Sequence, residues 1–324
     1  MGTSLILFAI GLVLLIKGGD WFVDGATGIA KRFNLPDIVV GATVVSIGTT
    51  LPEVMVSTTG ALQGSGAMAY GNAIGSIICN TALIAAISIT CNPGPVNVKS
   101  MKTPAIFFFG AAALYCVAAY ALGTFPQWMG FVMLAIFAVY MVLTVRNGLS
   151  NPDSAEEEEE EGGKPKKLWQ ELLLLVIGAA VIAVGADLLV EHGQIIAIGL
   201  GVPETVVALL FVALGTSLPE LVTTITSLKK GRASLGVGNV IGANVFNLVL
   251  VSGVAVSLAP FDVPVENTLL DTGLNLSLVF DIPVMLGVMS LMIFPAMLGK
   301  KLSRWQGIAL LCIYAAFVVC QFIL

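Results

Sequence analysis

The chain alternates between long apolar stretches and short polar connections along its whole length. A helix needs about 20 residues to cross a hydrocarbon layer of ~30 Å, and ten stretches meet that requirement. They lie at about residues 4 to 30, 37 to 60, 68 to 91, 103 to 122, 126 to 146, 168 to 198, 204 to 228, 234 to 258, 274 to 297 and 304 to 323. The pattern predicts an all-α membrane protein with ten transmembrane helices.

The apolar stretches contain an internal repeat. GTTLPE at residues 48–53 recurs as GTSLPE at 215–220, and GNAIGSIICN at 71–80 recurs as GNVIGANVFN at 238–247. Both pairs share one offset of 167 residues (215 minus 48, 238 minus 71). We therefore predict a duplicated unit, with a first five-helix repeat at 1–146, a linker at 147–167 and a second five-helix repeat at 168–324.

Basic residues divide the connections into two classes. Apart from Lys17, every Lys and Arg lies in an odd-numbered connection, whereas the even-numbered connections carry none. Because positive charge marks cytoplasmic loops, we expect the odd connections in the cytoplasm and both termini outside. The two repeats then enter the membrane in opposite senses, an inverted-topology arrangement typical of secondary transporters.

Composition agrees with the bilayer as the surroundings. Hydrophobic residues make up 57% of the chain and charged residues 11%, which is typical of a multi-pass protein of the cell membrane. Nothing in the charge pattern suggests nucleic acid, and no cofactor motif or obligate protein partner is evident. The acidic run Glu156–Glu161 lies in the cytoplasmic linker and is predicted to be a solvated spacer, since it lacks the glycine turn and spaced oxygens of a calcium-sensing loop.

Each copy of the repeated motif ends in a glutamate inside an apolar stretch, Glu53 in the first and Glu220 in the second. A carboxylate at membrane depth is costly and usually marks an ion or substrate pathway. Gly48 and Pro52 predict a helix break between them, which would expose carbonyl oxygens beside the glutamate. Together with nearby hydroxyls, these are the oxygen ligands that calcium and sodium prefer. The hydroxyls belong to Thr49, Thr50, Thr216 and Ser217.

The second repeated motif, at residues 71–80 and 238–247, is called the companion motif, and it adds neutral oxygens on one helix face. Asn72, Ser76 and Asn80 follow at intervals of four residues, so their side chains lie nearly above one another. The second repeat keeps both asparagines, as Asn239 and Asn247, but has Ala243 in place of the serine. One side of the predicted site therefore lacks a hydroxyl.

Several functions fit two buried carboxylates. A charge of −2 can be neutralised by one calcium ion, two sodium ions or two protons, so either a sodium-driven or a proton-driven calcium exchanger is possible, the latter with Glu53 and Glu220 as proton carriers. An intramembrane hydrolase is a remote alternative without a matching nucleophile or metal set, and the single histidine, His192, excludes a histidine metal site. Asp20 is predicted to be structural, with Lys17 as a partner at helical spacing.

The doubled motifs resemble the two alpha-repeats of the sodium/calcium exchanger family, within the cation/calcium antiporter superfamily, and particularly its short prokaryotic members. The resemblance implies an antiporter rather than an enzyme, which exchanges calcium for sodium by alternating access. It implies that Glu53 and Glu220 bind calcium with the carbonyls of Thr49 and Thr216. The other positions that it implies as ligands are Ser46 and Ala213 through their carbonyls, and Thr50, Ser76, Ser217, Asn80 and Asn247.

The chain departs from that family at three points. Asparagine stands at both Asn80 and Asn247, where some exchangers have one aspartate, so the site holds one negative charge fewer. Ser46 adds a hydroxyl where alanine is common, and Ala243 removes one where serine is common. These changes leave the number of sodium ions per calcium open, and also whether sodium or protons drive exchange.

Overall fold

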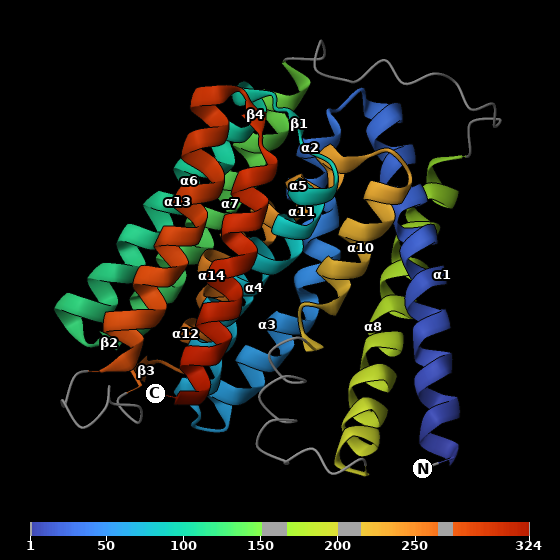
Figure 1. Cartoon of the computed structure of the whole chain (residues 1–324). Helices are drawn as coiled ribbons and strands as arrows, with labels where there is room; N and C mark the ends of the chain where they lie inside the picture. Colours follow the sequence, from blue (N-terminus) through green and yellow to red (C-terminus); the bar gives the residue numbers. More distant parts are fainter. Residues whose placement is uncertain (1, 151–166, 200–214, 265–274, 324) are drawn as a thin grey trace.

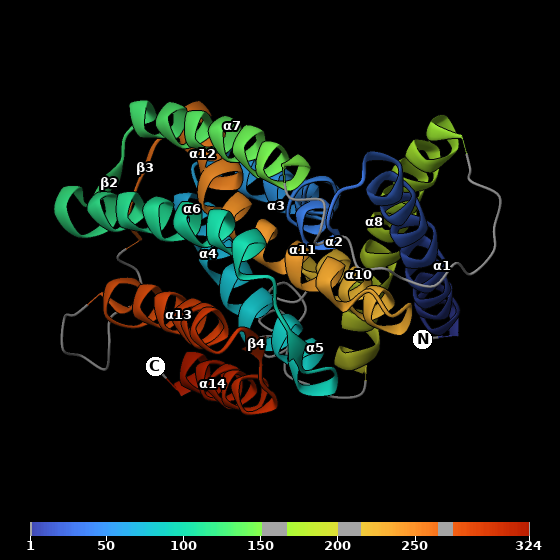
Figure 2. The same ribbon diagram turned by 90° about the horizontal axis from the view of Figure 1, so that it is seen from above.

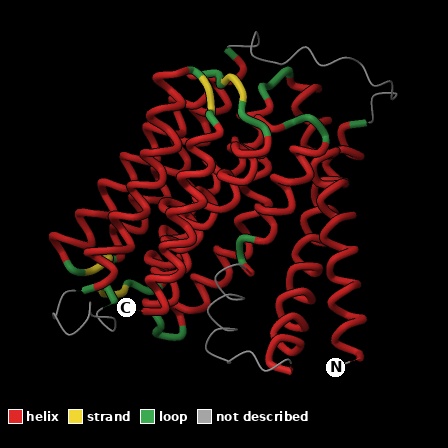
Figure 3. Tube along the Cα trace, in the orientation of Figure 1, coloured by secondary structure: helices red, strands yellow, loops and turns green. Residues whose placement is uncertain are grey.

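The computed structural model describes residues 2–150, 167–199, 215–264 and 275–323. Helices form almost all of the described chain, with strands only in four two-residue pieces (Figure 3). Within these residues, nine helices are long and apolar enough to cross a membrane. The fold class is confirmed as a helical membrane protein. The predicted seventh span, 204 to 228, lies partly outside the described residues, so the count of ten stays a prediction.

The first half contains five helical rods, three of which include a widened π-helical segment (Figure 1). Its elements are α1 (Gly2–Phe33), α2 (Asp37–Val40), η1 (Gly41–Val45), α3 (Ser46–Leu62), α4 (Gly66–Cys79), η2 (Asn80–Ala85), α5 (Ala86–Cys91), α6 (Val98–Cys116), η3 (Val117–Leu122) and α7 (Gln127–Leu149).

The described part of the second half has a similar order, except that its π-helical segment η6 precedes α13 whereas η3 follows α6. Its elements are α8 (Leu168–Gly199), α10 (Leu218–Lys229), α11 (Ala233–Phe246), η5 (Asn247–Val251), α12 (Ser252–Leu258), η6 (Ser277–Asp281), α13 (Ile282–Gly299) and α14 (Arg304–Ile323). The segments η2 and η5 begin at Asn80 and Asn247, which are repeat partners, so the duplication is visible in the local geometry of the helices as well as in the sequence.

Two long helices, α1 and α8, pack against each other at one side of the bundle (Figures 1 and 2). Glycines allow the close approach: a Cβ on Gly11 would lie 2.9 Å from the carbonyl oxygen of Gly185, and a Cβ on Gly185 would lie 2.9 Å from that of Gly11. Small residues at a crossing let membrane helices pack through their backbones. The repeat partners of Gly185 and Gly11 are Gly18 and Gly178, and they form the equivalent contact: a Cβ on Gly18 would lie 3.1 Å from the carbonyl oxygen of Gly178.

Two short antiparallel ladders tie the halves together at opposite ends of the bundle (Figure 1). β1 (Gly94–Pro95) pairs with β4 (Lys301–Leu302) at one end, and β2 (Thr124–Phe125) pairs with β3 (Phe261–Asp262) at the other. Each ladder takes one strand from each half.

The helix α11 lies in the centre of the bundle (Figure 2). Every residue from Leu235 to Phe246 is buried, because the sequence there consists of small and apolar residues together with two asparagines. Helices from both halves surround it, including α3, α6 and α10. Its position brings the second companion motif against the first half.

Asp20 has a different partner from the one predicted. Its side-chain Oδ1 lies 3.6 Å from Lys230 Nζ, which also lies 2.7 Å from Asp24 Oδ1; the described ion pairs do not include one between Asp20 and Lys17. Lys230 immediately follows α10 and reaches across to α1, a contact between halves that helical spacing within α1 cannot indicate. A structural role for Asp20 stays a prediction.

Candidate ion-binding site

The first glutamate motif lies on an unbroken helix. α3 runs from Ser46 to Leu62 and contains Pro52 inside it, so the prediction of a break between Gly48 and Pro52 is wrong. A Cβ on Gly48 would lie 2.8 Å from Cζ of Phe22. Gly48 therefore provides space for an aromatic ring from α1, and the packing around α3 holds the helix together although Pro52 cannot donate a hydrogen bond.

The irregular backbone lies one turn earlier, in η1. Its carbonyl oxygens are partly bonded by side chains: the Tyr140 hydroxyl donates to the carbonyl of Ala42 (2.9 Å), and the Ser46 hydroxyl lies 2.8 Å from that of Gly41. A π-helical turn is often found at a functional site. Here it places irregular backbone next to Ser46 rather than beside the proline.

The second glutamate motif does interrupt its helix. Gly215 is helical, Thr216 and Ser217 form a turn, and α10 begins at Leu218 with Pro219 in its first turn. Proline is tolerated there because that amide has no partner within the helix. Ala213, the remaining predicted ligand of this motif, lies outside the described residues.

Both glutamates are fully buried. The Thr50 hydroxyl donates to Oε1 of Glu220 at 3.4 Å, a contact between the two halves, and the Glu220 carboxylate is near enough to act electrostatically on Glu53. Among the described residues, neither oxygen of Glu53 and only one of Glu220 has a hydrogen-bond partner. Buried carboxylate oxygens without protein partners are costly, and a bound cation would relieve that cost.

A reciprocal pair of hydrogen bonds joins the glutamate motifs to the companion helices. The Thr49 hydroxyl donates to Oδ1 of Asn239 at 3.2 Å, and the Thr216 hydroxyl donates to Oδ1 of Asn72 at 3.2 Å. Thr49 and Thr216 are repeat partners, as are the two asparagines. Each motif is thus bonded to the companion helix of the other half, which sequence spacing within one half could not show.

The amide nitrogens of the same asparagines differ. Asn72 Nδ2 donates to Oγ of Ser57 (2.8 Å) and to the carbonyl oxygen of Glu53 (3.2 Å). Asn239 Nδ2 and the hydroxyl of Thr224, the repeat partner of Ser57, have no hydrogen-bond partner among the described residues. Ser57 and Thr224 were missed by the sequence analysis, although both follow a motif glutamate by four residues.

Ser46 also contacts Asn239. Its hydroxyl oxygen lies 2.9 Å from the Asn239 carbonyl oxygen and 3.2 Å from Asn239 Oδ1. A Cβ on Gly242 would collide with that hydroxyl. The serine found at position 46 thus bonds to the companion helix of the second half.

The remaining predicted positions are buried around this centre. Asn80 and Asn247 are fully buried at the first residues of η2 and η5, and neither amide group has a hydrogen-bond partner among the described residues. The hydroxyl of Ser76 is likewise buried without a partner, and Ala243 is fully buried with no oxygen to offer. The structure brings the described candidates onto four adjoining segments: α3, α4 with η2, the turn before α10, and α11 with η5.

The donor set is dominated by neutral oxygens. The described residues hold no cluster of three or more His, Cys, Asp or Glu side chains that could bind a metal ion. Two carboxylates surrounded by hydroxyl and amide oxygens suit hard cations such as sodium and calcium. Such a set can bind an ion and still release it.

Comparisons with known proteins match nearly the whole chain. The model of the family described as sodium/calcium exchanger protein matches residues 3–146 and 171–323. A sodium/calcium exchanger of Methanosarcina acetivorans is 30% identical over 99% of both chains. An uncharacterized membrane protein of Methanocaldococcus jannaschii is 34% identical, over 95% of this chain and 94% of that protein.

A solved structure is similar over the same extent. The sodium-calcium exchanger NCX_Mj, soaked with sodium and strontium, superposes with a TM-score of 0.80 at 32% sequence identity, covering 98% of each chain.

Proposed function

Because the chain belongs to the sodium/calcium exchanger family, we propose that it exchanges calcium for sodium across the membrane through a site built on Glu53 and Glu220. The protein is a multi-pass membrane antiporter. The observation that carries the proposal is the pair of fully buried carboxylates, one from each half, with oxygens that lack protein partners.

The charge of the site explains why two ions take turns. One calcium ion, or two sodium ions, would neutralise the two carboxylates, and a charge left uncompensated in the low-dielectric interior is strongly unfavourable. A change of accessibility is therefore favoured only with a loaded site. Alternating loading from the two sides gives exchange rather than leakage.

The ligands that we propose follow the repeat. Glu53 and Glu220 hold calcium with the carbonyl oxygens of Thr49 and Thr216. The flanking sodium positions and the centre of the site use Ser46, Thr50, Ser76, Asn80, Ala213, Ser217 and Asn247. The reciprocal bonds from Thr49 and Thr216 to the companion helices support this arrangement, since they fix the backbone of both motifs beside the glutamates.

We also propose an orientation. The connections rich in Lys and Arg face the cytoplasm and both termini face outward, because positive charge is retained on the cytoplasmic side. Under the usual gradients, sodium entering the cell would then drive calcium out. A family of transporters needs no catalytic residues, and we assign none.

Reconstitution in lipid vesicles tests the function directly. Radioactive calcium uptake is followed under an outward sodium gradient, an outward proton gradient, or no gradient. We expect uptake only with the sodium gradient. Uptake that follows the proton gradient and ignores sodium would instead establish a proton-driven exchanger, and uptake without either gradient would exclude obligatory antiport.

Two glutamine variants test the site. Glu53→Gln and Glu220→Gln each keep the shape of the side chain but remove one of the two charges, so we expect both to reduce calcium exchange to the level of empty vesicles. Asp20→Asn is the matched control, since Asp20 is bonded to Lys230 at the edge of the bundle, and it should exchange normally. Normal exchange by either glutamine variant would contradict the assignment.

A further inference from the structure

The segment formed by α2 and η1 packs against α11 almost without intervening side chains. A Cβ on Gly41 would collide with the carbonyl oxygen of Leu235, and a Cβ on Gly238 would collide with that of Ile38. A Cβ on Gly242 would lie 2.6 Å from the Cα of Ala42. Because backbone meets backbone along this contact, an ion has no path through it as it stands.

An ion pair closes the outer end of the same contact. Nη1 of Arg232 lies 2.9 Å and 2.8 Å from the two carboxylate oxygens of Asp37, and each side chain is only 11% exposed. Asp37 begins α2, and Arg232 immediately precedes α11. The pair therefore joins the first residues of the two packed segments. A buried pair of this kind loses its stabilisation when one partner is removed, because the other charge is left uncompensated.

The inner end of the contact is the ion site. Ser46, which follows η1, bonds to Asn239 of α11, and Asn239 also accepts from Thr49. A single interface thus leads from the Asp37–Arg232 pair, past Gly41, to the glutamate motif.

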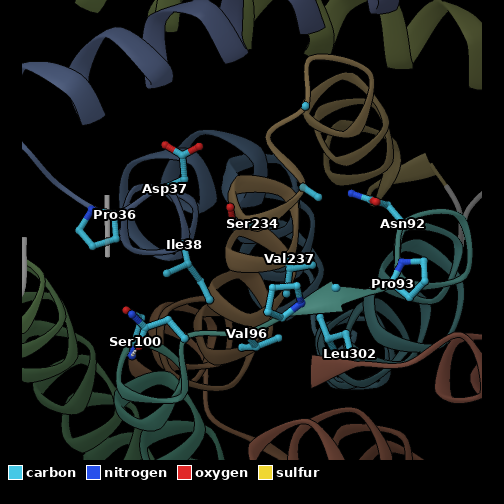
Figure 4. A pocket seen from close by; sticks show the side chains of 15 residues that line it. Pro36, Asp37, Ile38, Asn92, Pro93, Val96, Ser100, Ser234, Val237 and Leu302 are labelled. Atoms are coloured by element: carbon cyan, nitrogen blue, oxygen red, sulfur yellow. Dashed lines mark hydrogen bonds between the residues drawn. The ribbon is translucent and has the colours of Figure 1, made fainter. Parts of the chain in front are cut away.

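A pocket of about 270 Å³ lies just beyond the ion pair. Asp37 and Ile38 line it on the side of α2, with Ser234 and Val237 of α11 beside them and the loop at Pro93 opposite (Figure 4). Its wall thus includes Asp37 of the ion pair and Ile38, whose carbonyl oxygen meets Gly238 in the glycine contact.

The sequence carries different residues at the equivalent positions of the two halves. With the offset of 167, the partner of Arg232 is Ser65 and that of Gly41 is Ala208. Neither a basic side chain nor the third glycine is available there. On α4, Gly71, the partner of Gly238, is exposed instead of buried against another backbone. The two halves therefore differ in the residues that form the ion pair and the glycine contact at the basic end.

We infer that α2–η1 and α11 form the gate at the end of the protein that carries the basic loops, and that the Asp37–Arg232 pair is its latch. The inference rests on the proposed function for its inner end, the site at Glu53 and Glu220. To expose that site on this side, α2–η1 must move away from α11, which breaks the ion pair and the bond between Ser46 and Asn239. The latch makes the state closed at this end the favoured one in the absence of ions.

Hydrogen exchange in lipid nanodiscs tests the latch without measuring transport. Amide exchange of the segment Asp37–Val45 is followed by mass spectrometry in Asp37→Asn and in Arg232→Gln, without sodium or calcium. We expect exchange there to rise by about tenfold or more, because losing a buried pair removes more than the roughly 1.4 kcal/mol that a tenfold change represents. Unchanged exchange in both variants would overturn the inference.

Two further variants keep the result interpretable. Asp24→Asn breaks an exposed pair with Lys230 at the same end and should leave the segment unchanged; a rise equal to that of Asp37→Asn would contradict a specific latch. A single variant could raise amide exchange throughout the protein. The double variant Asp37→Arg with Arg232→Asp, which exchanges the two charges, then provides the test. Slow amide exchange of Asp37–Val45 in the double variant supports the latch, and fast exchange there rejects it.

The same variants in the calcium-uptake assay separate this inference from the proposed function. Increased local exchange with no sodium-dependent calcium uptake in the unmodified protein would reject the proposed function but leave the latch. Normal uptake with unchanged local exchange would reject the latch alone.

Discussion

The helices α4 and α11 carry the same companion motif and meet very different surroundings. On α11 the motif is buried throughout and Gly238 touches the backbone of α2. On α4 the motif begins at an exposed glycine, Gly71, where an added Cβ would meet none of the described residues within 4 Å. The asparagines differ too: the amide nitrogen of Asn72 has two partners, whereas that of Asn239 has none among the described residues.

This difference shows that the two copies of a motif can have different surroundings, and so different roles, in one conformation. In an inverted-repeat transporter the halves exchange roles when accessibility changes. A structure of one state should therefore show one copy sealed and the other open. Among the described residues, Gly238 and Gly71 differ in this sense, and variants at these equivalent positions can test the difference.

The largest contrast is expected between Gly238→Ala and Gly71→Ala. The first adds a methyl group where it would collide with the Ile38 carbonyl, and overpacking of this kind costs about 1–3 kcal/mol. The second adds the same group where none of the described residues lies within 4 Å, and it should change the free energy of unfolding by less than about 0.5 kcal/mol. Thermal unfolding of both variants in detergent measures the difference. Equal midpoints would mean that α4 and α11 are packed alike.

An intermediate contrast is expected between Ser57→Ala and Thr224→Val, which each delete one hydroxyl. Ser57 accepts a hydrogen bond from Asn72, so its loss should destabilise the protein by about 1 kcal/mol. The Thr224 hydroxyl is buried without a partner among the described residues, so its removal should be neutral or stabilising. The same unfolding assay applies. Greater destabilisation by Thr224→Val would show that its hydroxyl has a role in the fold.

The smallest effect is expected from Ala243→Ser, which makes the two companion motifs alike at this position. One more neutral oxygen contributes about 0.5–1.5 kcal/mol, so the sodium concentration for half-maximal exchange should shift by about two- to tenfold, with little change in calcium binding. Sodium titration of calcium uptake, with calcium binding measured by calorimetry, provides the test. An unaltered sodium response would mean that the missing hydroxyl is unimportant for coupling.

The sequence predicted the membrane fold because every helix that crosses the bilayer must be long and apolar. Three features belong to the whole chain: the length of the apolar stretches, the offset of 167 residues and the separation of the basic connections. A wrong interpretation of one residue does not change them. The confirmed family and helical fold follow from them. The boundaries of the repeats, the site residues and the orientation stay predictions.

Local geometry was harder to predict where it depends on contacts between distant segments. Gly48 and Pro52 indicated a break in α3, but Phe22 of α1 packs over the glycine and the helix continues. Asp20 was paired with the nearest lysine along its own helix, whereas Lys230 of the other half is its partner. The crossed bonds between Thr49 and Asn239 and between Thr216 and Asn72 likewise join segments that no local pattern connects.

The two strand ladders have a consequence for each half of the protein. Among the described residues, each half supplies strands that pair with strands of the other half, and the two ladders lie at opposite ends. A single five-helix unit could form neither ladder by itself, because each ladder needs one strand from either half. Neither half is therefore complete in its backbone pairing without the other.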